Sequence, residues 1–248
     1  MNPLPHVVLE LAAYAIGARL YWAARDPARG AMPLADQLAI LAGAICGAAL
    51  GSKLLYVAQY ASALASQPWT AWLSGKTVAG GLLGGWAGVE LAKRAVGWKA
   101  STGDRFVVPF AVALVIGRLG CQLSGAWDLT YGTPTDLPWG WDYGDGVPRH
   151  PVAGYEALAL IAFLVWHRAR PATGHPGERF RVFVATYLAL RVLLEFLKPP
   201  FGPAIGDVIV ADRHAGLTAI QWVCLAGFAV CLASLRRTRV VPAILPRH

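Results

Sequence analysis

The chain has 248 residues, of which 56% are hydrophobic and 15% are charged, and its formal net charge is +8. Its mean hydropathy is positive, at +0.47. This composition excludes a soluble globular domain and is typical of an integral membrane protein. We interpret the positive charge as a signal of membrane topology and expect no nucleic-acid partner.

Seven apolar runs are long enough to cross a bilayer as helices, which takes about 17–25 residues. They lie at approximately 6–24, 37–61, 77–95, 106–124, 151–168, 180–198 and 217–235. The third run is the weakest, because it is rich in glycine and ends in Glu90 and Lys93. We therefore predict an all-α polytopic membrane protein in which residues 1–248 form a single seven-helix domain. Its long outer loops are 125–149 and 199–216.

The basic residues gather on one side of the predicted bundle. Those that follow runs 1, 3, 5 and 7 are Arg25, Arg29, Lys93, Arg94, Lys99, Arg105, Arg168, Arg170, Arg179, Arg181, Arg236, Arg237, Arg239 and Arg247. The opposite loops contain only Lys76, Arg149, Lys198 and Arg213. Because cytoplasmic loops carry the excess of Lys and Arg, we predict that the N-terminus is outside and the C-terminus is inside.

Small residues recur four apart in the second and third runs. These glycines are Gly43, Gly47 and Gly51 in one run and Gly80, Gly81, Gly84, Gly85 and Gly88 in the other. Such spacing lets helix backbones approach closely in lipid, so we expect the two helices to pack tightly. Near the outer end of the third run, the bare backbone of Gly80 and Gly81 could also approach a ligand.

Two arginines interrupt apolar runs at a similar depth. Arg118 follows the apolar residues 107–117, and Arg191 follows residues 187–190. One arginine at the centre of a bilayer helix costs about 2.5–3.5 kcal/mol on insertion scales. It persists where it meets an anion, lines a wet cavity or pairs with a buried carboxylate. Lipid phosphate is the commonest anion at that depth, so we predict that the chain handles a lipid or another anionic amphiphile.

Other polar residues are expected at the same depth, in the outer half of the membrane. Tyr187, Arg191 and Glu195 are spaced four apart and so share one helix face. The helix directions also bring to this level Glu10, Gly80, Gly81, Tyr155 and Glu156. One cavity could collect all of them. The alternative is that the charges only neutralise one another, Glu195 with Arg191 and Glu156 with Arg118.

Four groups of residues, taken in order, resemble motifs of bacterial prolipoprotein diacylglyceryl transferase. They are the run at 80–85, Gly117-Arg118-Leu119-Gly120, Arg149-His150-Pro151 with Tyr155-Glu156-Ala157, and Tyr187 with Arg191 and Glu195. The resemblance covers nearly the whole chain and includes the seven-span topology. It implies a multi-pass protein of the bacterial cytoplasmic (inner) membrane. Such an enzyme moves the diacylglyceryl group of phosphatidylglycerol onto the lipobox cysteine of a preprolipoprotein and releases glycerol phosphate.

The resemblance implies that Arg118 and Arg191 are the central catalytic residues. This agrees with the chemistry of arginine, which presents a rigid fork of donors to phosphate and stays charged. The residues expected to bind substrate are Gly80, Gly81, Gly117, Gly120, Tyr155, Glu156, Tyr187 and Glu195. We expect no metal and no other cofactor, because the four cysteines are spaced for neither a zinc site nor a disulfide framework.

The chain departs from the family pattern at several positions. Ala79 stands where a histidine is expected, Cys121 where an asparagine is expected, and Ala126 where a glutamate is expected. Glu10 replaces a tyrosine of the first span. We therefore consider Glu10 and His150 as candidate bases. Two alternatives remain open: a relative that transfers lipid to another acceptor, and a non-enzymatic lipid-binding protein on the same scaffold.

Overall fold

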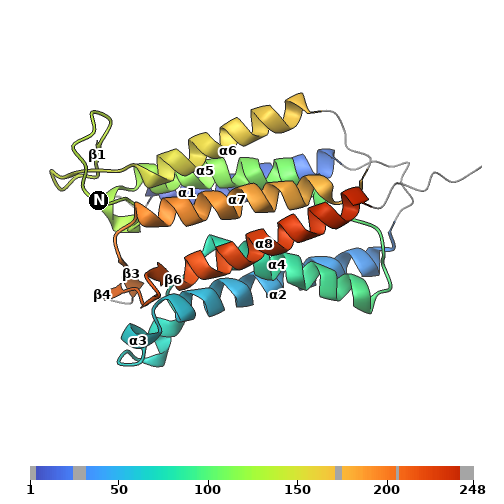
Figure 1. The fold of residues 1–248 in the computed structure, drawn as a ribbon, viewed down its shortest axis with the longest axis horizontal. Helices are drawn as coiled ribbons and strands as arrows, with labels where there is room; N and C mark the ends of the chain where they lie inside the picture. The colour runs from blue at the N-terminus through green and yellow to red at the C-terminus, as the bar shows by residue number, and fades with distance from the viewer. Residues whose placement is uncertain (1–3, 25–31, 171–174, 205–206, 241–248) are drawn as a thin grey trace, which may run out of the picture. The chain divides into compact units, whose positions relative to one another are not determined.

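The computed structural model describes residues 4–24, 32–170, 175–204 and 207–240, and most of them are helical (Figure 1). The chain divides into two compact units, which we describe separately. The first unit contains Met1–Arg25, Ser101–Pro199 and Ala229–His248. The second contains Asp26–Ala100 and Pro200–Phe228. The division falls inside α8 (Ala219–Val240), so each unit includes part of that helix.

The first unit is built mainly from four long helices. They are α1 (Leu4–Ala23), α5 (Val107–Leu123), α6 (Val152–Ala169) and α7 (Glu178–Phe196). The 3-10 turns η2 (Gly103–Phe106) and η3 (Gly125–Asp128) flank α5. Helix α5 is central, because it packs against α1, α6 and α7. Its inward residues, such as Val107, Ala111 and Arg118, are buried.

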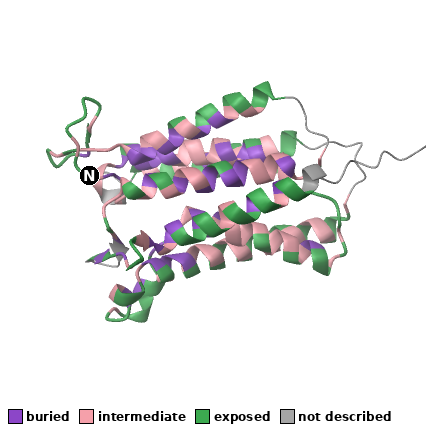
Figure 2. Ribbon diagram, viewed as in Figure 1, coloured by how far each residue is buried: buried purple, intermediate pink, exposed green. Residues whose placement is uncertain are grey.

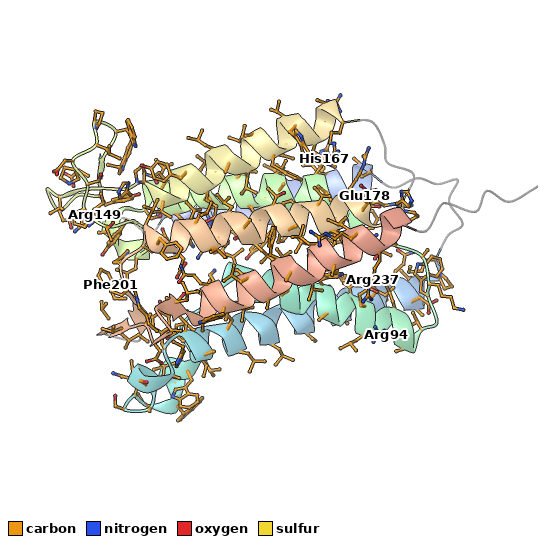
Figure 3. All side chains as sticks on the ribbon, viewed as in Figure 1. Arg94, Arg149, His167, Glu178, Phe201 and Arg237 are labelled. Carbon is orange, nitrogen blue, oxygen red and sulfur yellow. The ribbon has the colours of Figure 1, made fainter. Side chains whose placement is uncertain are left out.

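The register of α7 beside α5 is fixed by Asp104 of η2. Its carboxylate accepts hydrogen bonds from the backbone N–H of Gly177 at 2.6 Å and of Phe180 at 3.0 Å. An acidic group there satisfies N–H groups that have no partner within the helix. Figure 3 shows His167 and Glu178 at one end of the α6–α7 pair and Arg149 at the other. The two helices are therefore antiparallel.

The second unit is held together by glycine contacts between α2 (Leu34–Gln59) and α4 (Val78–Ala95). A Cβ added to Gly84 would lie 2.2 Å from the carbonyl oxygen of Gly47, and one added to Gly80 would lie 2.3 Å from that of Gly51. The predicted tight packing of these helices is confirmed. In the segment that joins these two helices, α3 (Ala61–Leu64) and η1 (Trp69–Leu73) form a small hydrophobic cluster with Tyr56.

We expect Gly84→Ala to destabilise the second unit by about 2 kcal/mol, because its methyl group would overlap backbone that cannot move aside alone. For a domain of this size, that loss lowers the midpoint of thermal unfolding by about 4–8 °C. The matched control is Gly85→Ala, whose new Cβ would meet its nearest neighbour at an ordinary 3.4 Å. Equal unfolding midpoints for the two variants in detergent would contradict the close contact.

Strands occur in both long loops, where the prediction of an all-α chain contained none. The antiparallel pairs are β1 (Trp141–Asp142) with β2 (Pro148–Arg149), β3 (Phe201–Ala204) with β4 (Asp207–Val210), and β5 (Arg213–His214) with β6 (Leu217–Thr218). The β-branched residues Val208, Ile209 and Val210 favour extended backbone. Ile209 is buried between exposed Val208 and Val210, as the alternation of a strand requires.

Four helical segments are long and apolar enough to cross a membrane within the described residues. They are Leu34–Gln59, Gly103–Leu123, Val152–Ala169 and Ala219–Arg237. Exposed residues occur along the long helices (Figure 2). They include large apolar ones, for example Leu38, Ile45 and Val165. Apolar surface of this extent marks contact with lipid rather than water. Each of the seven predicted runs coincides with a helix, whereas the number of spans and their orientation stay predictions.

Candidate functional site

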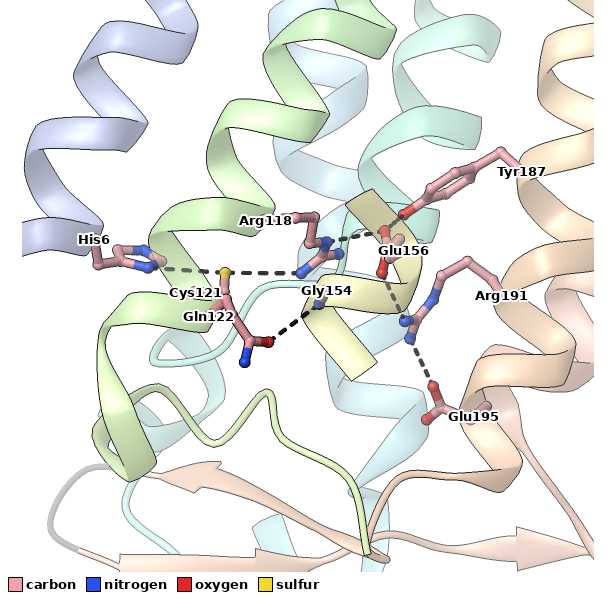
Figure 4. Close-up of polar contacts among 9 residues, drawn as sticks. All are labelled: His6, Arg118, Cys121, Gln122, Gly154, Glu156, Tyr187, Arg191 and Glu195. Atoms are coloured by element: carbon pink, nitrogen blue, oxygen red, sulfur yellow. Dashed lines mark hydrogen bonds and ion pairs between the residues drawn. The ribbon is translucent and has the colours of Figure 1, made fainter. Parts of the chain in front are cut away.

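Two buried arginines of the first unit share one carboxylate (Figure 4). Arg118 of α5 places Nε 2.9 Å from Oε1 of Glu156 in α6, and Arg191 of α7 places Nη1 3.4 Å from Oε2 of the same residue. The Glu156 side chain is 1% exposed. Three helices thus each bring a buried charged side chain to one point. The structure joins the two arginines that the sequence placed at equal depth.

The face of α7 completes this group. The hydroxyl of Tyr187 donates to Glu156 Oε1 at 2.9 Å, and Arg191 Nη2 donates to Glu195 Oε2 at 2.6 Å. We call Arg118, Glu156, Arg191 and Glu195 the arginine–glutamate cluster. Its formal charges sum to zero, which lets four ionised groups persist in a poorly hydrated place. The three residues spaced four apart in the sequence, Tyr187, Arg191 and Glu195, therefore form one polar stripe on α7.

The two arginines are held to different degrees. Arg191 uses separate nitrogens for Glu156 and Glu195, so two carboxylates orient it. Arg118 meets Glu156 through Nε, and its Nη1 lies 3.9 Å from the sulfur of Cys121. A neutral thiol is a weak acceptor compared with a carboxylate. The Nη side of Arg118 is therefore the more available face for an incoming anion.

A second chain of contacts starts at Cys121 and runs to α1. His6 Nδ1 lies 3.8 Å from Cys121 Sγ, and His6 Nε2 lies 3.4 Å from Glu10 Oε2. The hydroxyl of Tyr14 donates to Glu10 Oε1 at 2.8 Å. We call Cys121, His6 and Glu10 the histidine–cysteine arm. Glu10 thus reaches Arg118 through two intervening side chains.

His6 was not among the site residues predicted from the sequence. The available signal was its position four residues before Glu10, which places both side chains on one face of a helix. Its neighbourhood to Cys121 depends on how α1 meets α5. That contact was not readable from either helix alone.

The start of α6 is tied to α5 by Gln122. The Oε1 atom of this buried side chain accepts hydrogen bonds from the backbone N–H of Gly154 at 3.1 Å and from the hydroxyl of Tyr143 at 3.0 Å. Gly154 is two residues before Glu156. Gln122 therefore fixes the height at which Glu156 enters the arginine–glutamate cluster.

His150 and Tyr155, both expected in the site, contact each other instead. His150 Nδ1 lies 3.3 Å from the Tyr155 hydroxyl, which accepts a hydrogen bond from Trp139 Nε1 at 2.8 Å. Within the described part of the chain, no hydrogen bond or ion pair connects His150 or Tyr155 with Arg118 or Arg191. Nearby, the Asp145 carboxylate receives a hydrogen bond from Arg149 at 2.6 Å, which keeps the pKa of Asp145 below its usual value.

The four candidate glycines differ in their surroundings. A Cβ on Gly120 would lie 3.2 Å from the Cβ of Leu9, so Gly120 is needed where α1 crosses α5. A Cβ on Gly117 would meet nothing within 4 Å. A Cβ on Gly80 would clash with the backbone of α2, whereas one on Gly81 would have its nearest neighbours in α2 at 3.8 Å. Gly80 and Gly81 belong to the second unit, and their binding role stays a prediction.

A small apolar cavity lies between α6 and α7, next to Tyr187. Its volume is about 90 Å³, and it is lined by Ala159, Leu160, Phe163, Phe183, Thr186, Tyr187 and Leu190. Ligand pockets for whole small molecules usually measure ~300–1,000 Å³. This cavity can therefore hold only a short apolar segment beside the polar cluster.

We expect Glu195→Gln to lower the catalytic rate of the protein about tenfold without changing how that rate depends on pH. The reason is that Glu195 orients Arg191 and exchanges no proton. Steady-state rates measured between pH 5.5 and 9 would check this. Asp136→Asn, which removes an exposed carboxylate, is the control. Loss of the acidic limb in the Glu195 variant would instead assign this residue to proton transfer.

Comparison with known proteins identifies relatives along most of the chain. A family model described as prolipoprotein diacylglyceryl transferase matches residues 9–236. A protein of Bordetella parapertussis named phosphatidylglycerol–prolipoprotein diacylglyceryl transferase is 30% identical over 238 residues, which cover 90% of this chain and 86% of that protein. Proteins of the same name from Geobacter sulfurreducens and Nitratidesulfovibrio vulgaris are 38% identical over 178 residues and 36% identical over 210 residues. These matches cover 67% and 79% of this chain and 65% and 74% of the two relatives.

Proposed function

We propose, because the chain belongs to the prolipoprotein diacylglyceryl transferase family, that its arginine–glutamate cluster carries out the transfer for which that family is named. The substrate is phosphatidylglycerol, the acceptor is the cysteine thiol of a preprolipoprotein, and the by-product is glycerol phosphate. The observation that carries the proposal is the meeting of Arg118 and Arg191 at Glu156. It places two permanent cations, held in position, inside an apolar bundle.

The reaction makes charge at the place where the arginines lie. The acceptor sulfur attacks the glyceryl carbon next to the phosphate, a C–S bond forms, and the C–O bond breaks. Its electron pair stays on the phosphate oxygen of the departing glycerol phosphate. Fixed donors aimed at a developing anion are worth most where water is scarce. Arg118 supplies them through its Nη side, and Arg191 stays oriented by its two carboxylates.

The remaining residues position the lipid. Tyr187 joins the polar cluster to the apolar cavity between α6 and α7. In this proposal, the beginning of an acyl chain enters that cavity while the phosphate meets Arg118. Gly117 leaves open space one residue before Arg118. Seven spans, an outer N-terminus and the cytoplasmic membrane of a bacterium complete the proposed setting, with the site in the outer half of the bilayer.

The test uses the full chain purified in detergent, supplied with phosphatidylglycerol and a peptide that carries a lipobox cysteine. We expect glycerol phosphate to be released in equal amount to diacylglyceryl peptide, both quantified by mass spectrometry. Phosphatidylethanolamine in place of phosphatidylglycerol and a Cys→Ser peptide are the two negative controls. Binding of phosphatidylglycerol without release of glycerol phosphate would contradict the proposal.

A further inference from the structure

The crossing of α1 over α5 brings an imidazole to the edge of the proposed reaction site. Gly120 allows the approach, because a Cβ there would lie only 3.2 Å from the Cβ of Leu9 on α1. The next residue, Cys121, then faces His6 on one side and Arg118 on the other. The same thiol is therefore 3.9 Å from a phosphate-binding guanidinium and 3.8 Å from a histidine nitrogen.

The contacts of His6 assign its two nitrogens. Nε2 faces the carboxylate of Glu10 and so carries the ring proton. Nδ1 then presents its lone pair to the thiol of Cys121. The Glu10 carboxylate is itself held by the Tyr14 hydroxyl at 2.8 Å. Thiol, imidazole and carboxylate thus stand in the order in which a nucleophile, its base and the group that orients the base are arranged in enzymes.

We propose that the histidine–cysteine arm is the proton acceptor of the transfer reaction. This inference rests on the proposed function. As the acceptor sulfur forms its bond to the glyceryl carbon, its proton passes to Cys121 Sγ. The proton of Cys121 passes at the same time to Nδ1 of His6. The electron pair of the broken C–O bond leaves with glycerol phosphate, and the imidazolium is stabilised by Glu10.

The arm can return this proton for the next cycle. The side chains of His6 and Glu10 are 17% and 29% exposed, whereas Glu156 is 1% exposed. The imidazolium therefore has a route to water that the buried carboxylate of Glu156 lacks. A thiol also matches the acidity of the acceptor thiol, which favours efficient transfer between them. Ala79, where the family resemblance predicts a histidine, has no group that can exchange a proton.

Cys121 acts here as a relay and is not alkylated. If its sulfur attacked the lipid, the product would be a thioether, which water does not cleave, and the enzyme would stop after one event. Mass spectrometry of the protein after turnover distinguishes the two roles. The relay predicts unmodified Cys121, and a diacylglyceryl adduct on Cys121 would overturn it.

The kinetic test compares wild type with Cys121→Ala, His6→Gln and the double variant. We expect each single change to lower turnover about 100-fold, within the range for loss of a general base. The double variant should lose no more than either single one, because the two groups act as a unit. His6→Gln should also remove the acidic limb of the pH–rate profile. Among the described residues, the charged and titratable groups that face this unit include Glu10 and Tyr14 on α1, Arg118 on α5, and Tyr143 in the loop between β1 and β2.

Two controls separate these effects from damage to the fold. His214→Gln changes an exposed histidine of the second unit and should keep wild-type turnover. Elution volume and helical content should be the same for all variants. Turnover within threefold of wild type in Cys121→Ala or His6→Gln would overturn the relay while leaving the proposed function intact.

A second measurement tests the arm without the transfer reaction. The reagent is iodoacetamide, a small neutral alkylating agent, and the exposed Cys46 is the internal reference. An acceptor thiol must reach Cys121, so this reagent must reach it too. We expect Cys121 to react at pH 7 about tenfold more slowly in His6→Gln, with no change at Cys46. Equal rates, or no reaction of Cys121 in wild type, would overturn the arm. The proposed function would be overturned instead if the wild-type protein did not catalyse the transfer reaction while His6→Gln still slowed the alkylation of Cys121 as expected.

Discussion

Replacing Arg118 by lysine is expected to lower kcat/KM with phosphatidylglycerol by about 10²–10³-fold, the loss that follows removal of a fixed donor from a developing anion. An ammonium group keeps the charge but cannot reproduce the planar fork of the guanidinium. Arg191→Lys should also lose most activity, but less than Arg118→Lys. Arg191 is committed to Glu156 and Glu195, whereas Arg118 meets only one carboxylate through Nε.

The measurement is the initial rate of glycerol phosphate release at several lipid concentrations. Arg94→Lys, on an exposed position of α4, controls for the general effect of an Arg-to-Lys change. Activity near wild type in both cluster variants would show that charge alone is sufficient. A larger loss for Arg191 than for Arg118 would contradict the proposed order of the two arginines.

Removing the charge of Glu156 is expected to have the largest effect on stability. In Glu156→Gln, two buried guanidinium groups lose the carboxylate that they share. Removing one partner of a buried ion pair costs about 3–5 kcal/mol of folding stability. The midpoint of thermal unfolding should fall by at least about 6 °C. Phosphatidylglycerol should raise the unfolding midpoint of the variant by more than it raises that of wild type, because its phosphate supplies the missing negative charge.

Unfolding in detergent, with and without phosphatidylglycerol, checks this expectation. Asp136→Asn removes one exposed negative charge and should leave the midpoint unchanged within a degree or so. The neutral lipid diacylglycerol should give no selective rescue. A Glu156 variant as stable as wild type would show that the arginines do not depend on this bridge.

The helices, and the matching level at which Arg118 and Arg191 stand on them, could be predicted from the sequence, because both depend on local pattern. Apolar runs mark helices, and the four-residue spacing of Tyr187, Arg191 and Glu195 defines one face. That Glu156 would serve both arginines was not predictable, since it depends on Gln122 setting the height of α6. The alternative that the charges neutralise one another named two of the three ion pairs, Glu195 with Arg191 and Glu156 with Arg118, but not the bridge from Glu156 to Arg191.

Other features could not be predicted from the sequence, because they depend on contacts between distant segments. The place of His6 beside Cys121 follows from the α1–α5 crossing at Gly120, which neither helix reveals alone. His150 was considered as a base from its motif, but its ring contacts Tyr155. The strands of the two long loops are two to four residues long, too short for alternation to stand out.

The zero net charge of the arginine–glutamate cluster affects the release of the product from the enzyme. Glycerol phosphate can leave as a dianion, and two uncompensated arginines in an apolar bundle would hold a dianion so firmly that its escape limited the rate. In the proposed reaction, Glu156 stays beside both guanidinium groups and competes with the product for them as the product departs. The carboxylate thus acts as a built-in displacing ion, and free inorganic phosphate in the surrounding medium should be a weak inhibitor.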